Sequence, residues 1–174
     1  MNLLLVILLS SSSQSQNPMG FDQDKTTHHF VLTSSGGHIE VTVRDASDHA
    51  NLSAIREHLT HIAVQFEAGD FNIPVLVHGE KPPGSEVMKQ RKDQIEYRFE
   101  VLKDGGRITM TTKDRHVLEA IHEFLRYQIQ EHRTGDSAIP KPSFSPEQLS
   151  LASGLRMFPP MTRIHSHHWR NLRL

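Results

Sequence analysis

Apolar and polar side chains alternate with a period of two in the first part of the chain. Phe30 and Leu32 share one side of the first alternating run, and residues 39–43 form a second run after Gly36-Gly37. Successive side chains of a β-strand point to opposite faces, so this pattern predicts two half-buried antiparallel strands between residues 27 and 44. The Gly-Gly pair predicts the turn of a β-hairpin.

A helical spacing follows. Residues 51–67 place apolar side chains three and four positions apart, which predicts an amphipathic helix with one buried face. Gly69 is expected to cap its C-terminal end, because glycine readily adopts the left-handed conformation needed there. The predicted buried stripe consists of Ile55, Leu59, Ile62, Ala63 and Phe66.

The second half of the chain repeats this order of elements. Residues 95–101 and 108–112 alternate on either side of Gly105-Gly106 and predict another hairpin. Asp114 is expected to cap the N-terminus of a second helix. The buried stripe of this helix is predicted to contain Val117, Ile121, Phe124, Leu125, Gln128 and His132. Between the halves, a proline-containing linker over residues 71–84 leads into a short helix that Ser85 is expected to cap.

The two halves also match in sequence. Ala120-Ile121-His122-Glu123-Phe124-Leu125 repeats Ala54-Ile55-Arg56-Glu57-His58-Leu59, and Gly135-Asp136 repeats Gly69-Asp70, at a constant offset of 66 (120 − 54 and 136 − 70). A lone hairpin is marginal in water, so the two units are expected to pack together. The predicted fold is α+β: two β-hairpin-helix pseudo-repeats, residues 27–70 and 95–136, form a four-stranded antiparallel sheet with two helices on one face.

The two ends of the chain differ in composition from this central domain. Residues 1–16 contain a short apolar run followed by serines and glutamines, which favours a secretory signal peptide, although no lysine or arginine precedes the run. Residues 17–136 are expected to form a single domain. Residues 137–174 hold five of the nine prolines and end in a basic stretch, which predicts a disordered tail. The expected localisation is periplasmic or secreted, with no membrane span in the mature chain.

Composition excludes several classes of function. The formal net charge of −1 provides no basic surface for nucleic acid. The absence of cysteine excludes disulfide frameworks, thiolate zinc sites, iron–sulfur clusters and cysteine nucleophiles. The sequence contains no nucleophile-elbow motif and no phosphate-binding glycine motif. The main candidate chemistry is that of the thirteen histidines.

Three histidines from separate elements are expected to converge. Aligning the two Gly-Gly pairs puts His28 on the helix-facing side of its strand, far from the turn, and His29 on the opposite face. His132 lies on the predicted core stripe near the end of the second helix, and His58 lies beside the stripe of the first helix. A pseudo-twofold axis between the halves would bring the end of the second helix to the start of the first strand, and so bring His28, His58 and His132 together.

Converging imidazoles predict a transition-metal site, because neutral imidazole is a common ligand of copper and zinc. The leading candidate ligands are His28, His58 and His132, and the further candidates are His61, His29 and His78. The spacing is not specific, since no full ligand motif such as His-Glu-x-x-His occurs. The alternative for each histidine taken alone is a structural role, on a solvated helix flank or near a helix C-terminus.

The predicted function is therefore that of an exported, non-catalytic carrier or buffer of copper or zinc. A first alternative is a metal-free interaction or small-ligand module, in which the outer sheet face, including Val31, meets a partner or forms a homodimer. A second is a hydrolase or redox enzyme with a histidine-bound metal. Close approach of the three leading histidines favours metal binding over the first alternative.

Short motifs are spread through the central domain: His28-His29-Phe30, Gly69-Asp70-Phe71, Pro82-Pro83-Gly84, and the segments 120–126 and 134–136. In these motifs the chain resembles a family of small exported bacterial proteins of uncharacterised function. The resemblance covers about residues 19–136 and implies a bacterial origin and a secreted or periplasmic setting. It implies no activity, ligand or catalytic residue.

Overall fold

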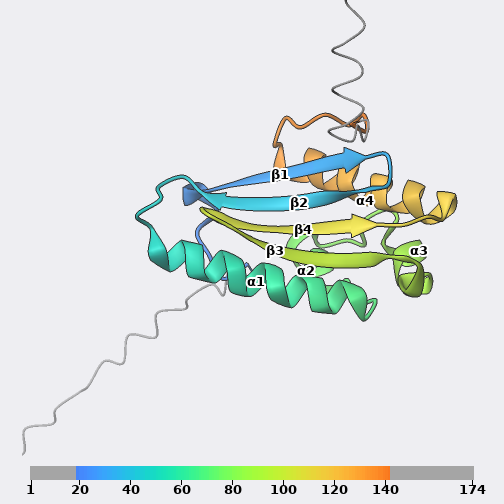
Figure 1. Cartoon of the computed structure of the whole chain (residues 1–174), viewed down its shortest axis with the longest axis horizontal. Coiled ribbons are helices and arrows are strands. Elements are labelled where there is room, and N and C mark those ends of the chain that lie inside the picture. Colours follow the sequence, from blue (N-terminus) through green and yellow to red (C-terminus); the bar gives the residue numbers. More distant parts are fainter. Residues whose placement is uncertain (1–18, 142–174) are drawn as a thin grey trace, which may run out of the picture. The chain divides into compact units, whose positions relative to one another are not determined.

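The structure is a computed structural model, which describes residues 19–141 of the 174-residue chain. A four-stranded sheet and the helices around it make up these residues (Figure 1). In chain order the elements are η1 (Gln23–Lys25), β1 (Thr26–Thr33), β2 (Gly36–Val43), α1 (His49–Glu67), α2 (Asn72–His78), α3 (Ser85–Gln90), η2 (Lys92–Gln94), β3 (Glu96–Leu102), β4 (Gly105–Thr111) and α4 (Arg115–His132). The predicted α+β class is confirmed.

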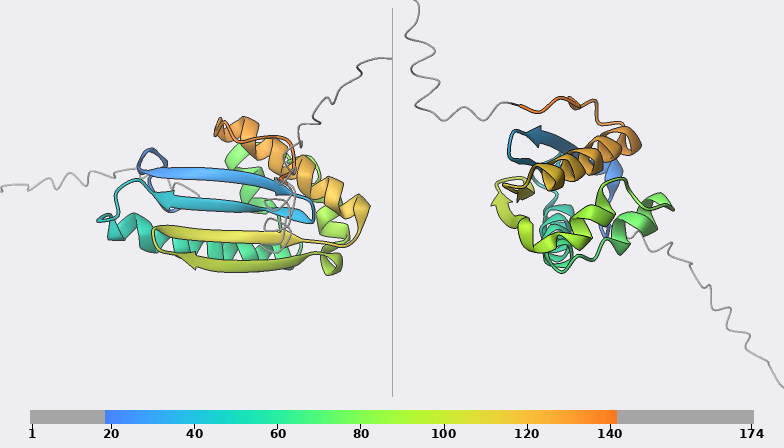
Figure 2. Two further views of the ribbon diagram at one scale, coloured as in Figure 1. Left: turned by 45° about the horizontal axis from the view of Figure 1, so that its top comes forward. Right: turned by 90° about the vertical axis from the view of Figure 1, so that its right-hand side faces the viewer.

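The sheet is antiparallel throughout, with the strand order β1-β2-β4-β3. The second strand of each hairpin therefore lies in the centre. The long helices α1 and α4 cover the same face, as predicted (Figure 2). The core lies between this face and the helices, where the rings of Phe66 and Phe124 meet edge to face with centroids 5.7 Å apart.

The glycine pairs differ from their predicted role. The tight turns of the two hairpins are Ser34-Ser35 and Lys103-Asp104, whereas Gly36-Gly37 and Gly105-Gly106 begin β2 and β4. A side chain on the first glycine of either pair would collide with the backbone of the neighbouring central strand. Glycine is needed at these positions because β2 and β4 approach closely, and not because the turn requires it.

Each long helix packs mainly against the strands of the other half. α1 covers β3 and β4, and α4 covers β1 and β2. The second glycine of each pair makes room for this crossing, since Leu125 of α4 lies over Gly37 and Leu59 of α1 lies over Gly106. The two leucines are separated by the offset found in the sequence, 125 − 59 = 66. The core therefore depends on both halves of the domain.

Two polar side chains also connect each long helix to the hairpin turn of the other half. Arg56 of α1 donates to three carbonyl oxygens at the β3-β4 turn, at distances of 2.6 to 3.2 Å. His122 of α4 is buried, and its Nε2 donates to the carbonyl oxygens of Thr33 at 2.9 Å and Gly36 at 3.0 Å. Arg56 and His122 again differ by 66 positions (122 − 56). The hydrogen bonds of His122 therefore give this residue a structural role at the β1-β2 turn.

The linker between the halves contains a helix that its sequence pattern did not predict. α2 begins after Asp70, whose carboxylate accepts a hydrogen bond from the Asn72 N–H at 2.9 Å. It ends at Gly79, which has a left-handed φ of 74°. Pro74 is tolerated in this helix because it lies in the first turn, where backbone N–H groups have no intrahelical acceptor.

The short helix α3 follows the linker, as predicted, but its N-cap differs. Gly84 occupies the N-cap position, and Ser85 is the first helical residue. The Ser85 hydroxyl donates to the Pro82 carbonyl at 2.6 Å instead of capping the helix. The serine thus stabilises the turn before the helix.

The outer face of the sheet is polar. Arg107 on β4 binds Glu40 on β2 at 2.6 Å, and Glu100 on β3 lies 3.8 Å from Arg107. Val31 on β1 is half-buried. This face therefore presents paired charges rather than a continuous apolar surface of the kind that marks a docking site.

The chain after α4 runs back along β1. The Asp136 carboxylate accepts hydrogen bonds from the Phe30 N–H at 2.9 Å and from His29 Nδ1 at 3.0 Å. The Lys141 N–H donates to the Leu32 carbonyl at 2.8 Å. The domain therefore extends past its predicted boundary at residue 136, to at least Lys141.

Two further predictions fall outside the described residues. These are the signal peptide over residues 1–16 and the remainder of the predicted tail, residues 142–174. Within residues 19–141, no helix has the length and apolar content needed to cross a membrane.

Candidate functional site: a cavity lined by histidines

Four histidines line one cavity beneath the sheet. His28 comes from β1, His58 from α1, His78 from the end of α2 and His132 from the end of α4. The cavity has a volume of about 60 Å³, enough for a few water molecules or one small ligand. Apart from these imidazoles and Gln128, the described side chains that line it are apolar.

The rings of His28 and His132 stack on one another. Their centroids are 5.2 Å apart and their planes differ by 23°. His78 meets His132 edge-on, also with centroids 5.2 Å apart. The end of α4 thus reaches the start of β1, as the sequence predicted.

His58 is connected to the other cavity histidines through the aromatic ring of Phe21, which contacts both His58 and His28. Phe21, in the loop before η1, stacks on His28 with centroids 5.7 Å apart and meets His58 edge-on at 5.5 Å. Phe21 was not among the predicted site residues. Its ring lies against two of the three leading candidates.

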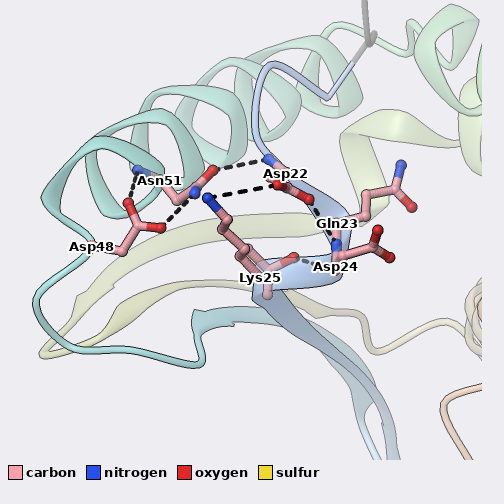
Figure 3. A network of polar contacts seen from close by, with 7 residues as sticks. Asp22, Gln23, Asp24, Lys25, Asp48 and Asn51 are labelled. Atoms are coloured by element: carbon pink, nitrogen blue, oxygen red, sulfur yellow. Dashed lines mark hydrogen bonds and ion pairs between the residues drawn. The ribbon is translucent and has the colours of Figure 1, made fainter.

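The loop that carries Phe21 is tied to the start of α1 (Figure 3). The Asp22 N–H donates to Asn51 Oδ1 at 2.8 Å, and Asn51 Nδ2 donates to Asp48, the N-cap of α1, at 2.7 Å. The ammonium group of Lys25 lies 3.9 Å from the Asp22 carboxylate. Since Asp22 is the next residue after Phe21, this network helps to hold the aromatic ring over the histidines.

The imidazoles of His28, His58 and His132 are neutral at physiological pH. Burial is the main cause that lowers the pKa of His28 to about 4, and the positive charges that His132 and His58 would carry add to the effect. Burial also lowers the pKa of His58 and of His132 to about 4, with smaller contributions from His61 and His78 respectively. Each neutral ring holds one unprotonated nitrogen with a free lone pair.

Two polar atoms of the cavity wall are buried and lack a hydrogen-bond partner among the described residues. They are His28 Nε2 and Gln128 Nε2. The other end of the Gln128 amide accepts a hydrogen bond from His78 Nε2 at 3.0 Å. His78 Nδ1 in turn faces Glu131 at 3.9 Å. Buried polar groups in proteins are normally paired, so these two atoms indicate where a ligand would bind.

Two of the predicted site residues do not line the cavity. His29 points to the outer face of the sheet, where its Nδ1 donates to Asp136. His61 is exposed on α1, one turn after His58. The structure therefore brings together His28, His58, His78 and His132 and leaves His29 and His61 apart.

The cavity is not arranged as a ready-made metal centre. Between residues 19 and 141, no three histidine, aspartate or glutamate side chains stand in positions that would hold a metal ion. His28 and His132 stack face to face, and the Phe21 ring lies against both His28 and His58. The cavity supplies neutral imidazole nitrogens in apolar surroundings, and its described lining contains no carboxylate for acid–base chemistry.

Gln128 and His78 are the polar residues that sequence reasoning undervalued. Gln128 lies on the predicted buried stripe of the second helix but is not a predicted site residue, and His78 is only a further candidate because it falls in the predicted linker over residues 71–84. A signal for α2 was present in the sequence: Asp70 precedes it, Pro74 falls in its first turn, and Gly79 follows it. The spacing of Pro74 and His78, four residues apart, then places both on one helix face.

No protein-family model, curated protein or solved structure matches this chain. The functional conclusion therefore depends on the chemistry of the cavity.

Proposed function

We propose that this protein binds a transition-metal ion, copper or zinc, through His28, His58 and His132, and that it serves as a carrier or buffer rather than as a catalyst. The observation that carries the proposal is the gathering of these neutral imidazoles around one cavity, with the Nε2 atom of His28 buried and unpaired. An imidazole nitrogen must be unprotonated to bind a metal. The lowered pKa values of the three rings meet this condition at neutral pH.

The ligand type selects the metal. Imidazole suits zinc and copper, and an oxygen-rich set would be needed for magnesium or calcium. The chain has no cysteine, so no thiolate is available to favour Cu(I). Zn²⁺ and Cu²⁺ are the ions that the donor set fits best.

Binding requires a local rearrangement around Phe21. The Phe21 ring touches both His28 and His58, so the nitrogens of these two rings reach a common ion only when the phenylalanine moves aside. The ring is carried by the short loop that the Asp22–Asn51 hydrogen bond ties to α1. We expect the metal-bound form to differ from the metal-free form mainly in this loop.

The test is metal titration of the full chain. His165, His167 and His168 in the C-terminal segment are replaced by alanine in every sample, because clustered histidines bind metal in any buffer. Calorimetry and elemental analysis then measure the stoichiometry and affinity for Zn²⁺ and Cu²⁺. We expect one ion per chain, and loss of that ion in the triple variant His28→Ala, His58→Ala, His132→Ala.

The matched control replaces three exposed histidines, His49→Ala, His61→Ala and His116→Ala. It removes the same number of imidazoles without touching the cavity lining. Circular dichroism verifies that both triple variants are folded. Equal metal binding by the two variants, or no stoichiometric metal in the reference protein, would overturn the proposal.

A metal-free function for the same cavity is the second candidate. The face-to-face stacking of His28 on His132 and the apolar lining favour a small organic ligand with a hydrogen-bonding group. In that case metal titration gives no specific binding, and small aromatic compounds raise the melting temperature of the reference protein but not of the cavity variant.

The proposed setting is periplasmic or extracellular, with the chain cleaved after the apolar N-terminal run. N-terminal sequencing of the protein secreted by a bacterial host tests this part of the proposal. A mature chain that begins between about residues 14 and 18 supports export, and an intact Met1 contradicts it.

A further inference from the structure

The two edges of the sheet differ in what covers them. At the β1 edge, the segment after α4 supplies Asp136 and Lys141 to the main chain of the strand. At the opposite edge, β3 is hydrogen-bonded to β4 on one side (Figure 2). None of the backbone hydrogen bonds that the described residues make outside their helices and strands reaches residues 96–101. An uncovered edge strand presents N–H and C=O groups that can pair with another strand.

Helix α1 leaves this edge accessible. It packs against β3 and β4 and also contacts β2, so it lies over the sheet rather than beyond its β3 edge. Val101 of β3 is 64% exposed, although the alternation of the strand puts its side chain on the same side as the partly buried Phe99. A strand added beside β3 would cover this apolar side chain.

The outer face of β3 carries charges of alternating sign. Glu96, Arg98 and Glu100 occupy every second position of the strand, and the first two are exposed. Charges on an edge strand restrict its partners, because like charges directly opposite each other destabilise a pair of strands. Opposite charges in the same positions stabilise the pair. The pattern on β3 therefore favours only a register that brings opposite charges together.

Pairing of β3 with a second copy of itself meets this condition in one register. In an antiparallel pair about a twofold axis, the residue on the axis faces its own copy. An axis at Phe99 puts Arg98 opposite Glu100 of the second chain, and symmetry repeats this pair. It also puts the exposed Val101 opposite Tyr97 and includes all seven residues of the strand. An axis at Arg98 or at Glu100 would instead put that charged side chain opposite itself.

We propose that two copies of this protein pair through their β3 strands, antiparallel about a twofold axis at Phe99, and so join two four-stranded sheets into one continuous sheet. The partner is a second copy of this chain, selected by the two Arg98–Glu100 pairs between the strands. The proposal is independent of the metal site, since the described lining of the histidine cavity contains no residue of β3.

The experiment is sedimentation of the full chain over a concentration series that extends into the millimolar range. EDTA is present in every sample, so that bound metal cannot link chains. The variants are Arg98→Glu, Glu100→Arg and the double variant that carries both changes. Lys141→Glu is the control, because it reverses an exposed charge at the covered β1 edge. Circular dichroism verifies that each variant is folded.

Each single reversal puts like charges opposite each other twice, and the double variant restores opposite charges with the signs exchanged. We expect the dissociation constant of the dimer to rise about tenfold or more in each single variant. In the double variant it should return to within about threefold of the reference value, and Lys141→Glu should leave it unchanged. The contacts of Arg98 with Glu96 and of Glu100 with Arg107 lie within one chain, so their loss affects monomer and dimer alike.

Three results would overturn the proposal. The first is a reference protein that remains monomeric at every concentration. The second is a dimer that the single reversals do not weaken, as expected if the chains associate through another surface. The third is a dimer that the single reversals weaken and the double variant does not restore, because that result contradicts the pairing of Arg98 with Glu100.

Discussion

At the scale of single residues, Arg56 and His122 perform the same task in the two halves. The side chain of each extends from its helix and donates hydrogen bonds to backbone carbonyl oxygens at the hairpin turn of the other half. Arginine does this from a partly exposed position, whereas His122 does it inside the core. A neutral imidazole fits there because one N–H donates to two carbonyl oxygens and the rest of the ring packs as an apolar side chain.

We predict that His122→Ala lowers the free energy of unfolding by about 2–4 kcal/mol, because it removes the hydrogen bonds to the carbonyl oxygens of Thr33 and Gly36 and leaves a cavity in the core. Urea unfolding measures this quantity. His116→Ala, an exposed position on the same helix, is the control and should change stability by less than about 0.5 kcal/mol. Equal effects of the two substitutions would show that the contacts of His122 contribute little.

The sequence was informative about residues whose surroundings depend on a regular pattern. His28 and His132 were placed correctly because a strand alternates faces and a helix has a buried stripe. Phe21 was missed because it precedes the first strand, where no periodic pattern assigns a direction to its side chain. The predicted ligand role of His78 met a competing contact, since its Nε2 is bound to Gln128.

At the scale of elements, β1 is an edge strand that is covered after the chain has completed α4. Asp136 binds the Phe30 N–H and the Lys141 N–H binds the Leu32 carbonyl, so a short segment occupies hydrogen-bonding groups that an edge would otherwise expose. Burial alone would raise the pKa of Asp136, but hydrogen bonds from Phe30, Thr134 and His29 lower it below its usual value. The segment is thus held by a carboxylate that is charged at neutral pH.

We predict that Asp136→Ala speeds amide hydrogen exchange at Phe30 by about tenfold or more and lowers stability by about 1–3 kcal/mol, because the N–H loses a charge-assisted hydrogen bond. Exchange measured by NMR gives a value for the single amide. Ser137→Ala, at the exposed position that follows, is the control. Unchanged protection of the Phe30 amide would mean that the segment does not protect the edge.

Most elements were predictable because their apolar periods are long and unambiguous. The four strands and the two long helices are within about three residues of their predicted ranges, and the largest differences are at β2 and β4, which begin at the glycine pairs. Helix α2 was not predicted, because seven residues show too short a period. The glycine pairs were interpreted as turns from their composition. Their true constraint is the approach of β2 to β4, which pairs residues far apart in the sequence.

At the scale of the whole molecule, the buried histidines make stability depend on pH. His28, His58 and His132 have a pKa of about 4 in the folded chain, whereas the ordinary pKa of a histidine is 6.5. Between these two pH values the unfolded chain takes up protons that the folded chain does not, so the unfolded state gains stability as the pH falls. Of the titratable groups that face these rings, His78 contributes to the lowered pKa of His132, and Glu131 lies 3.9 Å from His78 Nδ1.

We predict that the free energy of unfolding of the metal-free protein is highest above pH 6.5 and falls steadily towards pH 4, by a few kcal/mol in total. Urea unfolding at a series of pH values measures the slope. The triple variant His28→Gln, His58→Gln, His132→Gln should lose most of this pH dependence. The control variant His49→Gln, His61→Gln, His116→Gln, at exposed positions, should keep it. An unchanged slope in the cavity variant would contradict the assignment of the effect to these rings.

The assembly of the two halves was only partly predictable. An assumed pseudo-twofold axis between the halves predicted that the end of the second helix meets the start of the first strand, and the stacking of His28 on His132 shows that these two ends do meet. The crossing of each helix onto the strands of the other half was not predicted, because local periodicity specifies which face of a helix is buried but not which strands cover it.

This crossing has a consequence for association between chains. The first half supplies β1, β2 and α1, and the second half supplies β3, β4 and α4. Because α1 packs mainly on β3 and β4, and α4 packs on β1 and β2, the same contacts can also form between the first half of one molecule and the second half of another. If the linker around α2 and α3 opened, two chains would exchange halves and form a domain-swapped dimer with the same core. Each histidine cavity would then combine His28 and His58 of one chain with His132 of the other, and ligand binding would link the two molecules.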